Sequence, residues 1–281
     1  MELYPMNINY RYYDLEYFFK TCNNENCRNV ELWLCPQHFL VNAQYMQDTD
    51  LLLNLMNKYN IKVQVVCGEQ NNPKPNNIAA RSSFLIENTY KYFCKVVDLA
   101  SQIGAKMILV TPGWNYYDEN PDVARERSIL MLRRIADYAK DKNIKLAMET
   151  IWSKSSLVAN TISKAKEILE GGNRDNFGLT IDFGAMHYAE ETLKDWFETF
   201  PGKIWHIHFV DGKPTGHMPW GYGNLNMSEY VSSLKKYGYS GGLSLEYVDP
   251  ISFMEPEKYL KSTKELFNSC IYQEEENDKT L

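Results

Sequence analysis

The sequence has no excess of positive charge. Lys and Arg number 30 against 36 Asp and Glu among 281 residues, which gives a formal net charge of −6. Proteins that bind nucleic acids or anionic membranes use a basic surface, so both classes of partner are disfavoured and a small-molecule substrate is favoured. The chain also lacks a signal-peptide pattern and any apolar run near the roughly 20 residues that cross a bilayer. We therefore expect a cytoplasmic protein without membrane contact.

Cysteine is present, but its spacing does not match that of a disulfide framework or a zinc site. The six cysteines are scattered through the chain without CxxC or CxH patterns. This distribution is typical of reduced thiols and disfavours a disulfide framework or a structural zinc site.

Short apolar runs alternate with long amphipathic stretches from one end of the chain to the other. This alternation is typical of βα units and a parallel sheet. The eight strand-like runs are residues 6–10, 30–34, 61–67, 106–111, 144–150, 177–183, 203–210 and 242–247. A helix-like stretch follows each run, beginning near Leu15, Asp50, Asn77, Asp122, Thr161, Glu191, Met227 and Glu255. The pattern predicts an α/β fold, a single (β/α)₈ TIM barrel, rather than a doubly wound sheet.

Neither a linker nor an internal repeat divides the chain. We therefore expect one barrel domain over residues 1–270. Residues 271–281 are charged and poor in apolar side chains, so we expect a solvated, disordered tail without a function of its own.

The last four predicted strands end in polar residues, namely Glu149, Asp182, His208 and Glu246. Side chains alternate between the faces of a strand, and barrel active sites lie at the carboxyl ends of the strands. All four are thus expected to point into the barrel mouth. Three carboxylates there would repel one another unless a cation neutralised them, so we predict one divalent ion: Mn²⁺, Co²⁺, Mg²⁺ or Zn²⁺. The alternative is four isolated strand-end residues or structural ion pairs.

Several segments resemble the xylose isomerase-like barrel superfamily of sugar isomerases and epimerases, which includes metal-dependent endonucleases for abasic DNA. The resemblance spans residues 30–247 and rests on KPNNIAARSS, IGAKMILVTPG, LAMETIW, LTIDFGA, HIHFVDGKPTGHMPWGYGNLN and KKYGYSGGLSLE. Within the superfamily, the ELW and HxHxVD segments look most like the fructoselysine 3-epimerase group of ketose 3-epimerases. The resemblance implies that Glu149, Asp182, His208 and Glu246 hold one metal ion, that Glu149 and Glu246 are also acid and base, and that the protein is a homo-oligomer.

The sequence also departs from its relatives. The DNA-repair branch has His where Ala185 stands and an Asp-x-His pair where Thr215 and His217 stand, so ligands for further metals are largely absent. Several ketose 3-epimerases place a substrate-binding Glu where Ser155 stands, so the substrate pocket is expected to differ.

Four further residues are candidates for contact with a substrate. His38 matches a family position near the sugar. Glu69 and Trp114 follow the third and fourth predicted strands, and the Trp114 ring could stack on a sugar or form a lid over the core. His217 lies in the loop after the seventh strand, where it could bind a substrate oxygen or be exposed.

Three more polar residues near these motifs are expected to have structural tasks. His206 should be a packed, hydrogen-bonded neighbour of the site. His187 should lie at the surface or an interface. Asp211 should fix the loop after the seventh strand through bonds to backbone N–H groups.

The four strand-end residues indicate a reaction. A ketose bound to one metal through O2 and O3 becomes more acidic at the carbon beside its carbonyl. Glu149 and Glu246 on opposite sides of that carbon would allow 3-epimerisation of a ketose or ketosamine through a metal-stabilised cis-enediolate. Transfer of the proton along one face would instead make the protein an aldose-ketose isomerase. An inosose-type dehydratase, a non-catalytic sugar-binding barrel and a disfavoured abasic-site endonuclease remain as alternatives.

Overall fold

The structure, a computed structural model, describes residues 1–70, 73 and 76–278, the last six of these by backbone only. Within these residues, eight parallel strands form one sheet in the order β1-β8-β7-β6-β5-β4-β3-β2. They are β1 (Glu2–Pro5), β2 (Asn29–Trp33), β3 (Lys62–Cys67), β4 (Met107–Val110), β5 (Lys145–Glu149), β6 (Phe177–Asp182), β7 (Ile204–His208) and β8 (Gly242–Leu245). A bridge between Met6 and Glu31 joins the two ends of the sheet. The predicted single (β/α)₈ barrel is confirmed.

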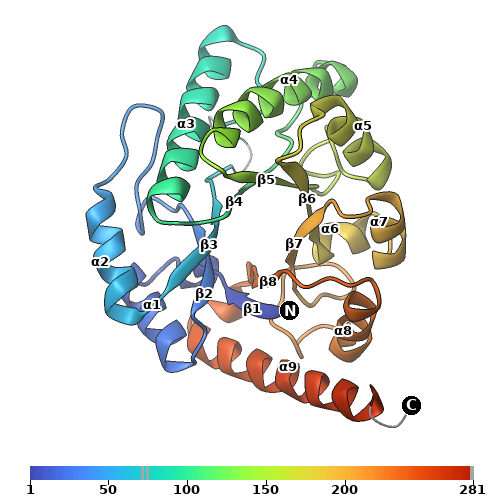
Figure 1. The fold of residues 1–281 in the computed structure, drawn as a ribbon. Coiled ribbons are helices and arrows are strands. Elements are labelled where there is room, and N and C mark those ends of the chain that lie inside the picture. The colour runs from blue at the N-terminus through green and yellow to red at the C-terminus, as the bar shows by residue number, and fades with distance from the viewer. Residues whose placement is uncertain (71–72, 74–75, 279–281) are drawn as a thin grey trace.

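Helices surround the strands on all sides (Figure 1). They are α1 (Leu15–Asn24), α2 (Thr49–Tyr59), α3 (Ser83–Gln102), α4 (Pro121–Lys140), α5 (Ile162–Gly172), α6 (Phe183–Tyr188), α7 (Leu193–Thr199), α8 (Met227–Lys236) and α9 (Pro256–Asp278). Two short 3₁₀ helices, η1 (Asn7–Tyr10) and η2 (Pro250–Ser252), follow β1 and β8. Side-chain caps start several helices. Asn120, for example, accepts the N–H of Asp122, and Pro121 occupies the first turn of α4.

The bulky strand residues that alternate with the predicted ligands point outward to the helices. They are completely or almost completely buried in the same apolar cluster as the inner faces of α3, α4 and α5, and include Met148, Ile181, Ile207 and Leu245. Burying such a side chain contributes roughly 1.5–3 kcal/mol. Because this set faces the helices, the alternate set on each strand faces the barrel interior.

The first strand differs from its prediction. We expected a strand over residues 6–10, but β1 ends at Pro5 and η1 follows. The cause is the Asn7 side chain, which accepts the N–H of Trp33 at 2.6 Å and donates to the carbonyl of Trp33 at 2.9 Å. A side chain that bonds the backbone of another strand competes with a regular ladder, and Asn has a low strand propensity.

Two helices near the mouth also differ from their predictions. α3 starts at Ser83 rather than near Asn77, because the Ser82 hydroxyl accepts the N–H of Leu85 and fixes the first turn. The short helix α6 was not expected. It begins directly after β6 because the Asp182 carboxylate accepts the N–H of Ala185 at 2.6 Å.

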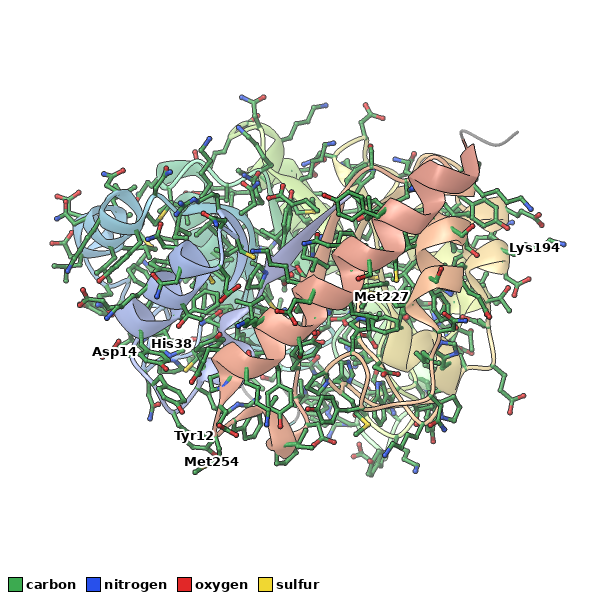
Figure 2. All side chains as sticks on the ribbon, turned by 90° about the horizontal axis from the view of Figure 1, so that it is seen from below. Tyr12, Asp14, His38, Lys194, Met227 and Met254 are labelled. Atoms are coloured by element: carbon green, nitrogen blue, oxygen red, sulfur yellow. The ribbon has the colours of Figure 1, made fainter. Side chains whose placement is uncertain are left out.

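The last helix reaches into the segment for which we expected a disordered tail. α9 runs along one side of the barrel (Figure 2) and continues to Asp278, and the disorder of this segment stays a prediction. Gln and Glu are good helix formers, which lets α9 extend through this charged segment. Residues 279–281 lie outside the described residues. In the described part of the chain, no helix has both the length and the apolar character needed to cross a membrane.

A buried aspartate fixes the long loop after β7. The Asp211 carboxylate accepts the backbone N–H groups of Gly212, Gly221, Gly223 and Leu225 at 2.8–3.0 Å. A side chain at position 223 would collide with this carboxylate, so glycine is required there. The predicted structural task of Asp211 is confirmed.

Asp211→Ala is expected to lower the free energy of unfolding by about 2–4 kcal/mol. It would leave four N–H groups without their charged acceptor. Urea unfolding followed by circular dichroism measures the change. Asp175→Ala, at an exposed position, is the control and should change stability by no more than about 0.5 kcal/mol. Equal free energies of unfolding for Asp211→Ala and Asp175→Ala would contradict the structural role of Asp211.

Candidate metal centre

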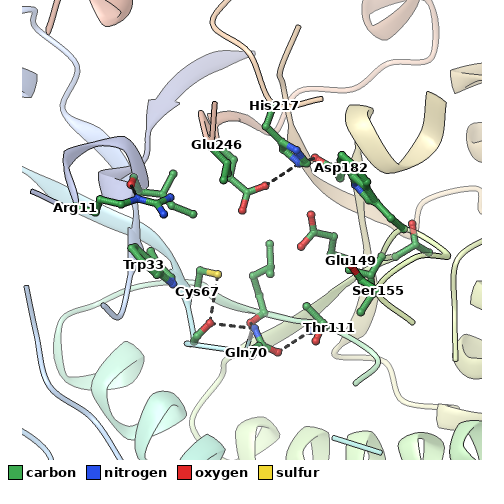
Figure 3. A pocket seen from close by; sticks show the side chains of 17 residues that line it. Arg11, Trp33, Cys67, Gln70, Thr111, Glu149, Ser155, Asp182, His217 and Glu246 are labelled. Atoms are coloured by element: carbon green, nitrogen blue, oxygen red, sulfur yellow. Dashed lines mark hydrogen bonds and ion pairs between the residues drawn. The ribbon is translucent and has the colours of Figure 1, made fainter. Parts of the chain in front are cut away.

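Four side chains from consecutive strands meet at the carboxyl end of the barrel. Glu149 ends β5, Asp182 ends β6, His208 ends β7 and Glu246 directly follows β8. One ligand atom from each lies within 4.8 Å of those of the other three. Figure 3 shows the three carboxylates around one end of a cavity. The structure therefore brings together all four residues predicted as metal ligands.

The spacing of these atoms suits a single ion. His208 Nδ1 lies 2.9 Å from Glu149 Oε1, 3.0 Å from Glu246 Oε2 and 4.0 Å from Asp182 Oδ2. Donor atoms bound to one ion at roughly 2.1 Å are about 3–4 Å apart. The His208 and Asp182 side chains are no more than 1% exposed, whereas those of Glu149 and Glu246 are 11% and 15% exposed and reach the cavity. Three oxygen donors and one nitrogen donor could hold a divalent cation here.

The charged groups of the cluster strongly shift one another's pKa values. Burial raises the pKa of Glu149 to about 7, and the charge of Glu246 acts in the same direction. Burial would also raise the pKa of Glu246, but His208 and His217 outweigh it and hold that pKa well below its usual value. Burial would lower the pKa of His208, yet the surrounding carboxylates raise it well above the usual value.

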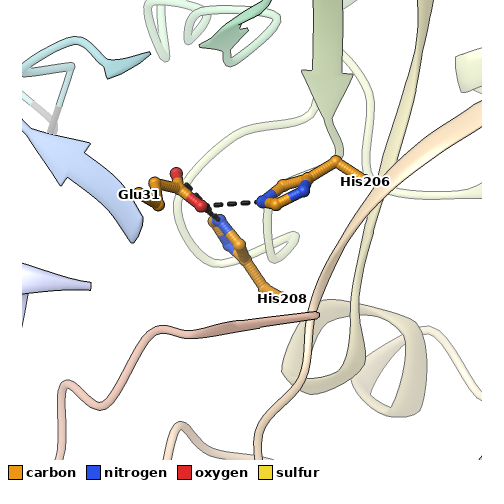
Figure 4. A group of neighbouring side chains, drawn as sticks. All are labelled: Glu31, His206 and His208. Carbon is orange, nitrogen blue, oxygen red and sulfur yellow. Dashed lines mark hydrogen bonds and ion pairs between the residues drawn. The ribbon is translucent and has the colours of Figure 1, made fainter. Parts of the chain in front are cut away.

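Glu31 fixes His208 from inside the barrel. Its carboxylate lies 3.3 Å from His208 Nε2 and 2.7 Å from His206 Nε2 (Figure 4). A carboxylate that accepts the N–H of a ligand imidazole sets the ring's tautomer and orientation, which here turns Nδ1 toward the cluster. Burial would raise the pKa of Glu31, but the two imidazoles lower it to about 2.

This role of Glu31 was not predicted from the sequence. A charged residue inside an otherwise apolar strand was the available signal. His206, by contrast, is the buried, hydrogen-bonded neighbour that was predicted.

The cluster forms one wall of a cavity of about 460 Å³. His217 lies beside the cluster, with Nε2 3.0 Å from Asp182 Oδ2 and 3.3 Å from Glu246 Oε2. Its ring stacks on that of Trp152 at a centroid distance of 5.7 Å. The remaining lining residues are Ile8, Arg11, Trp33, Cys67, Gly68, Gln70, Leu109, Thr111, Glu149, Thr150, Ile151, Ser155 and Val248.

His38 does not line the cavity. The Asn7 amide donates to its Nδ1 at 2.7 Å, and its Nε2 lies 2.9 Å from the carbonyl of Tyr13. Both ring nitrogens therefore support the loops after β1 and β2. Substrate contact by His38 stays a prediction that the lining of the cavity does not support.

Glu69 and Trp114 follow β3 and β4 as expected, but neither lines the cavity. The Asn77 side chain accepts the N–H of Trp114 and donates to its carbonyl, both at 2.9 Å. The indole ring packs on Tyr116. This arrangement fits the packing alternative for Trp114. Substrate contact by either residue stays a prediction.

Several residues of the cavity were not predicted, above all Arg11, Trp33 and Trp152. Trp33 lies two positions after Glu31 on the same face of β2, and Trp152 follows Glu149 by three positions. Aromatic residues at the end of a strand or shortly after it were the signal. Arg11 directly follows η1, a segment that we expected to be a strand, but it is not aromatic and belongs to no motif.

The family model of the xylose isomerase-like TIM barrel matches residues 19–270, and the chain belongs to this family. Inosose isomerase of Halalkalibacterium halodurans is 31% identical over 144 residues, which are 48% of this chain and 51% of that protein. Fructoselysine 3-epimerase of Shigella flexneri is 23% identical over 185 residues, 64% of this chain and 65% of that protein. The chain thus spans only about half to two thirds of the length of these relatives.

A solved structure, that of the IOLI protein with a binding zinc atom, has the same fold. Its TM-score is 0.79 at 19% identity, covering 97% of this chain and 99% of that chain. The resemblance inferred from the sequence motifs is therefore confirmed at the level of family and fold.

Glu31→Gln is expected to weaken the binding of Mn²⁺ or Zn²⁺ by roughly 10–100-fold, the usual scale for losing a partner of a ligand imidazole. Titration of the metal-free protein against a chelating dye measures the affinity. Glu229→Gln, on the exposed face of α8, is the matched control and should bind metal as the unaltered protein does. The same affinity in both variants would show that Glu31 does not orient His208 for a metal.

Proposed function

We propose that the protein is a metal-dependent epimerase that acts at carbon 3 of a ketose or ketosamine. The convergence of Glu149, Asp182, His208 and Glu246 on one point at the end of a cavity carries the proposal. Membership of the xylose isomerase-like family and the similarity to proteins named inosose isomerase and fructoselysine 3-epimerase support it.

One divalent ion, Mn²⁺, Co²⁺, Mg²⁺ or Zn²⁺, would be held by these four residues. When bound, it would supply a positive charge that polarises the substrate's carbonyl and stabilises the negative charge of an enediolate. The zinc in the similar IOLI structure supports a divalent ion without choosing among metals.

The two glutamates are the proposed acid and base. They lie on β5 and after β8, which are separated in the sheet by β6 and β7, so they reach the cavity from different sides. One carboxylate would remove the proton from carbon 3, and the other would return a proton to the opposite face. The configuration at carbon 3 is thereby inverted.

The remainder of the cavity suits a sugar. Its volume of about 460 Å³ falls in the ordinary range for small-molecule sites. Trp33 and Trp152 offer aromatic faces to the apolar side of a sugar ring or chain. His217, beside the cluster, is placed to donate a hydrogen bond to a substrate oxygen.

Isomerisation is the second candidate, favoured by the 31% identity to inosose isomerase. On the same cluster, a single glutamate would carry the proton between adjacent carbons along one face of the substrate. The position at which solvent hydrogen enters the sugar separates this reaction from epimerisation.

Glu149→Gln and Glu246→Gln are each expected to lower turnover by roughly 10²–10⁴-fold, because an amide cannot take up the proton. A panel of ketoses and ketosamines in deuterated water with Mn²⁺, followed by NMR, measures exchange and epimer formation. Metal content is measured on the same samples, so that loss of the ion is not mistaken for loss of the base. Glu229→Gln should retain the activity of the unaltered protein.

The position of deuterium decides the outcome. Deuterium at carbon 3 together with the 3-epimer supports the proposal. Deuterium at carbon 1 or 2 with an aldose product would make the protein an isomerase, and loss of water from the sugar would make it a dehydratase. Absence of exchange with every sugar in the metal-loaded protein would contradict the proposal.

A further inference from the structure

An arginine stands across the cavity from the acidic cluster. Arg11 directly follows η1 and, with Trp33, lies on the wall opposite Asp182 and Glu149 (Figure 3). Among the described residues that line the cavity, it is the one Lys or Arg. The two walls therefore carry opposite charge.

The guanidinium of Arg11 is held in place by groups that do not neutralise it. Its Nε donates to the carbonyl of Ile8 at 2.8 Å. Its guanidinium carbon lies 5.5 Å from the ring centroid of Trp33 and 4.5 Å from that of Phe253. These contacts fix the guanidinium but use only one of its three nitrogens. Within the described part of the chain, Nη1 and Nη2 have neither a carboxylate nor a hydrogen-bond partner.

Two other arginines of the barrel are neutralised by carboxylates. Arg125 Nη1 lies 2.8 Å from Asp122 and 2.9 Å from Glu167. Arg127 Nη2 lies 2.7 Å from Glu119. Unlike these two, Arg11 has no carboxylate partner among the described residues and lines the cavity beside the acidic cluster.

We propose that the substrate carries an oxyanion, a phosphate or a carboxylate, at the end remote from the reacting carbons, and that Arg11 binds it. The inference deepens the proposed function and rests on it. The free edge of a guanidinium matches two oxygens of a phosphate or carboxylate, and such charge-assisted pairs are stronger than neutral hydrogen bonds.

The charge of the cluster favours the same orientation. At that wall the divalent ion and His217 would already be paired with the three carboxylates, whereas Arg11 has no carboxylate partner among the described residues. The anionic end of a substrate is then directed toward Arg11, and the neutral carbons of the sugar are left beside Glu149 and Glu246. Arg11 would therefore select both the class of substrate and its direction in the cavity.

Binding of unreactive polyols tests the inference separately from catalysis. Calorimetry on the Mn²⁺-loaded protein compares sorbitol with sorbitol 6-phosphate and gluconate, which distinguish the two sources of the oxyanion. At least one anionic polyol should bind roughly 10-fold or more tightly than sorbitol, and Arg11→Met should abolish this preference. Arg11→Lys should restore part of it. Arg28→Met, just before β2 at the other end of the barrel, is the matched control and should keep the preference.

Equal binding of sorbitol and both anionic polyols by the unaltered protein would overturn the inference. So would an anionic preference that survives in Arg11→Met, since the ion at the cluster would then be the binding group. If Arg11→Met does not fold, Arg11→Lys and the salt dependence decide, because added salt should weaken binding of the anionic polyol alone. If the preference for anionic polyols depends on Arg11 but no sugar is turned over, only the proposed reaction is rejected. Turnover of neutral ketoses without such a preference would reject the role of Arg11 only.

Discussion

Three carboxylates share one buried imidazole, and the barrel is arranged to keep them together. Like charges about 4 Å apart repel by roughly 4 kcal/mol each at an effective dielectric constant near 20. The strands overcome this repulsion because their ladders fix the residues side by side, with Asp182 paired to His208 and His208 to Ser244. Glu31 holds the imidazole from below. A divalent ion is the charge that would balance the cluster.

The residues around the cluster are also held in place by specific contacts. The Asp211 carboxylate ties down the loop that carries His217, and His217 in turn contacts Asp182 and Glu246. Across the cavity, Trp33 is fixed by Asn7 and stacks on Arg11. One wall is thus acidic and the other aromatic and basic. A substrate would meet both, which gives it a defined direction relative to Glu149 and Glu246.

The sequence predicted the parts of the molecule that depend on local periodicity. The βα alternation gave the barrel, and the two-residue period of the last four strands gave Glu149, Asp182, His208 and Glu246. The parts that the sequence did not reveal depend on distant contacts. Asn7 bonds the backbone of β2 and replaces a strand with η1. Glu31 acquires its role only from His208, 177 residues away. His38 is held by Asn7 and Tyr13, and a motif match could not reveal that.

Anomalous X-ray scattering from crystals grown with Mn²⁺ or Zn²⁺ tests the central claim most directly. The account predicts one ion per chain, roughly 2.0–2.3 Å from His208 Nδ1 and from oxygens of Glu149, Asp182 and Glu246. An ion bound elsewhere, or none at this cluster at saturating metal with these side chains placed as described, would contradict it.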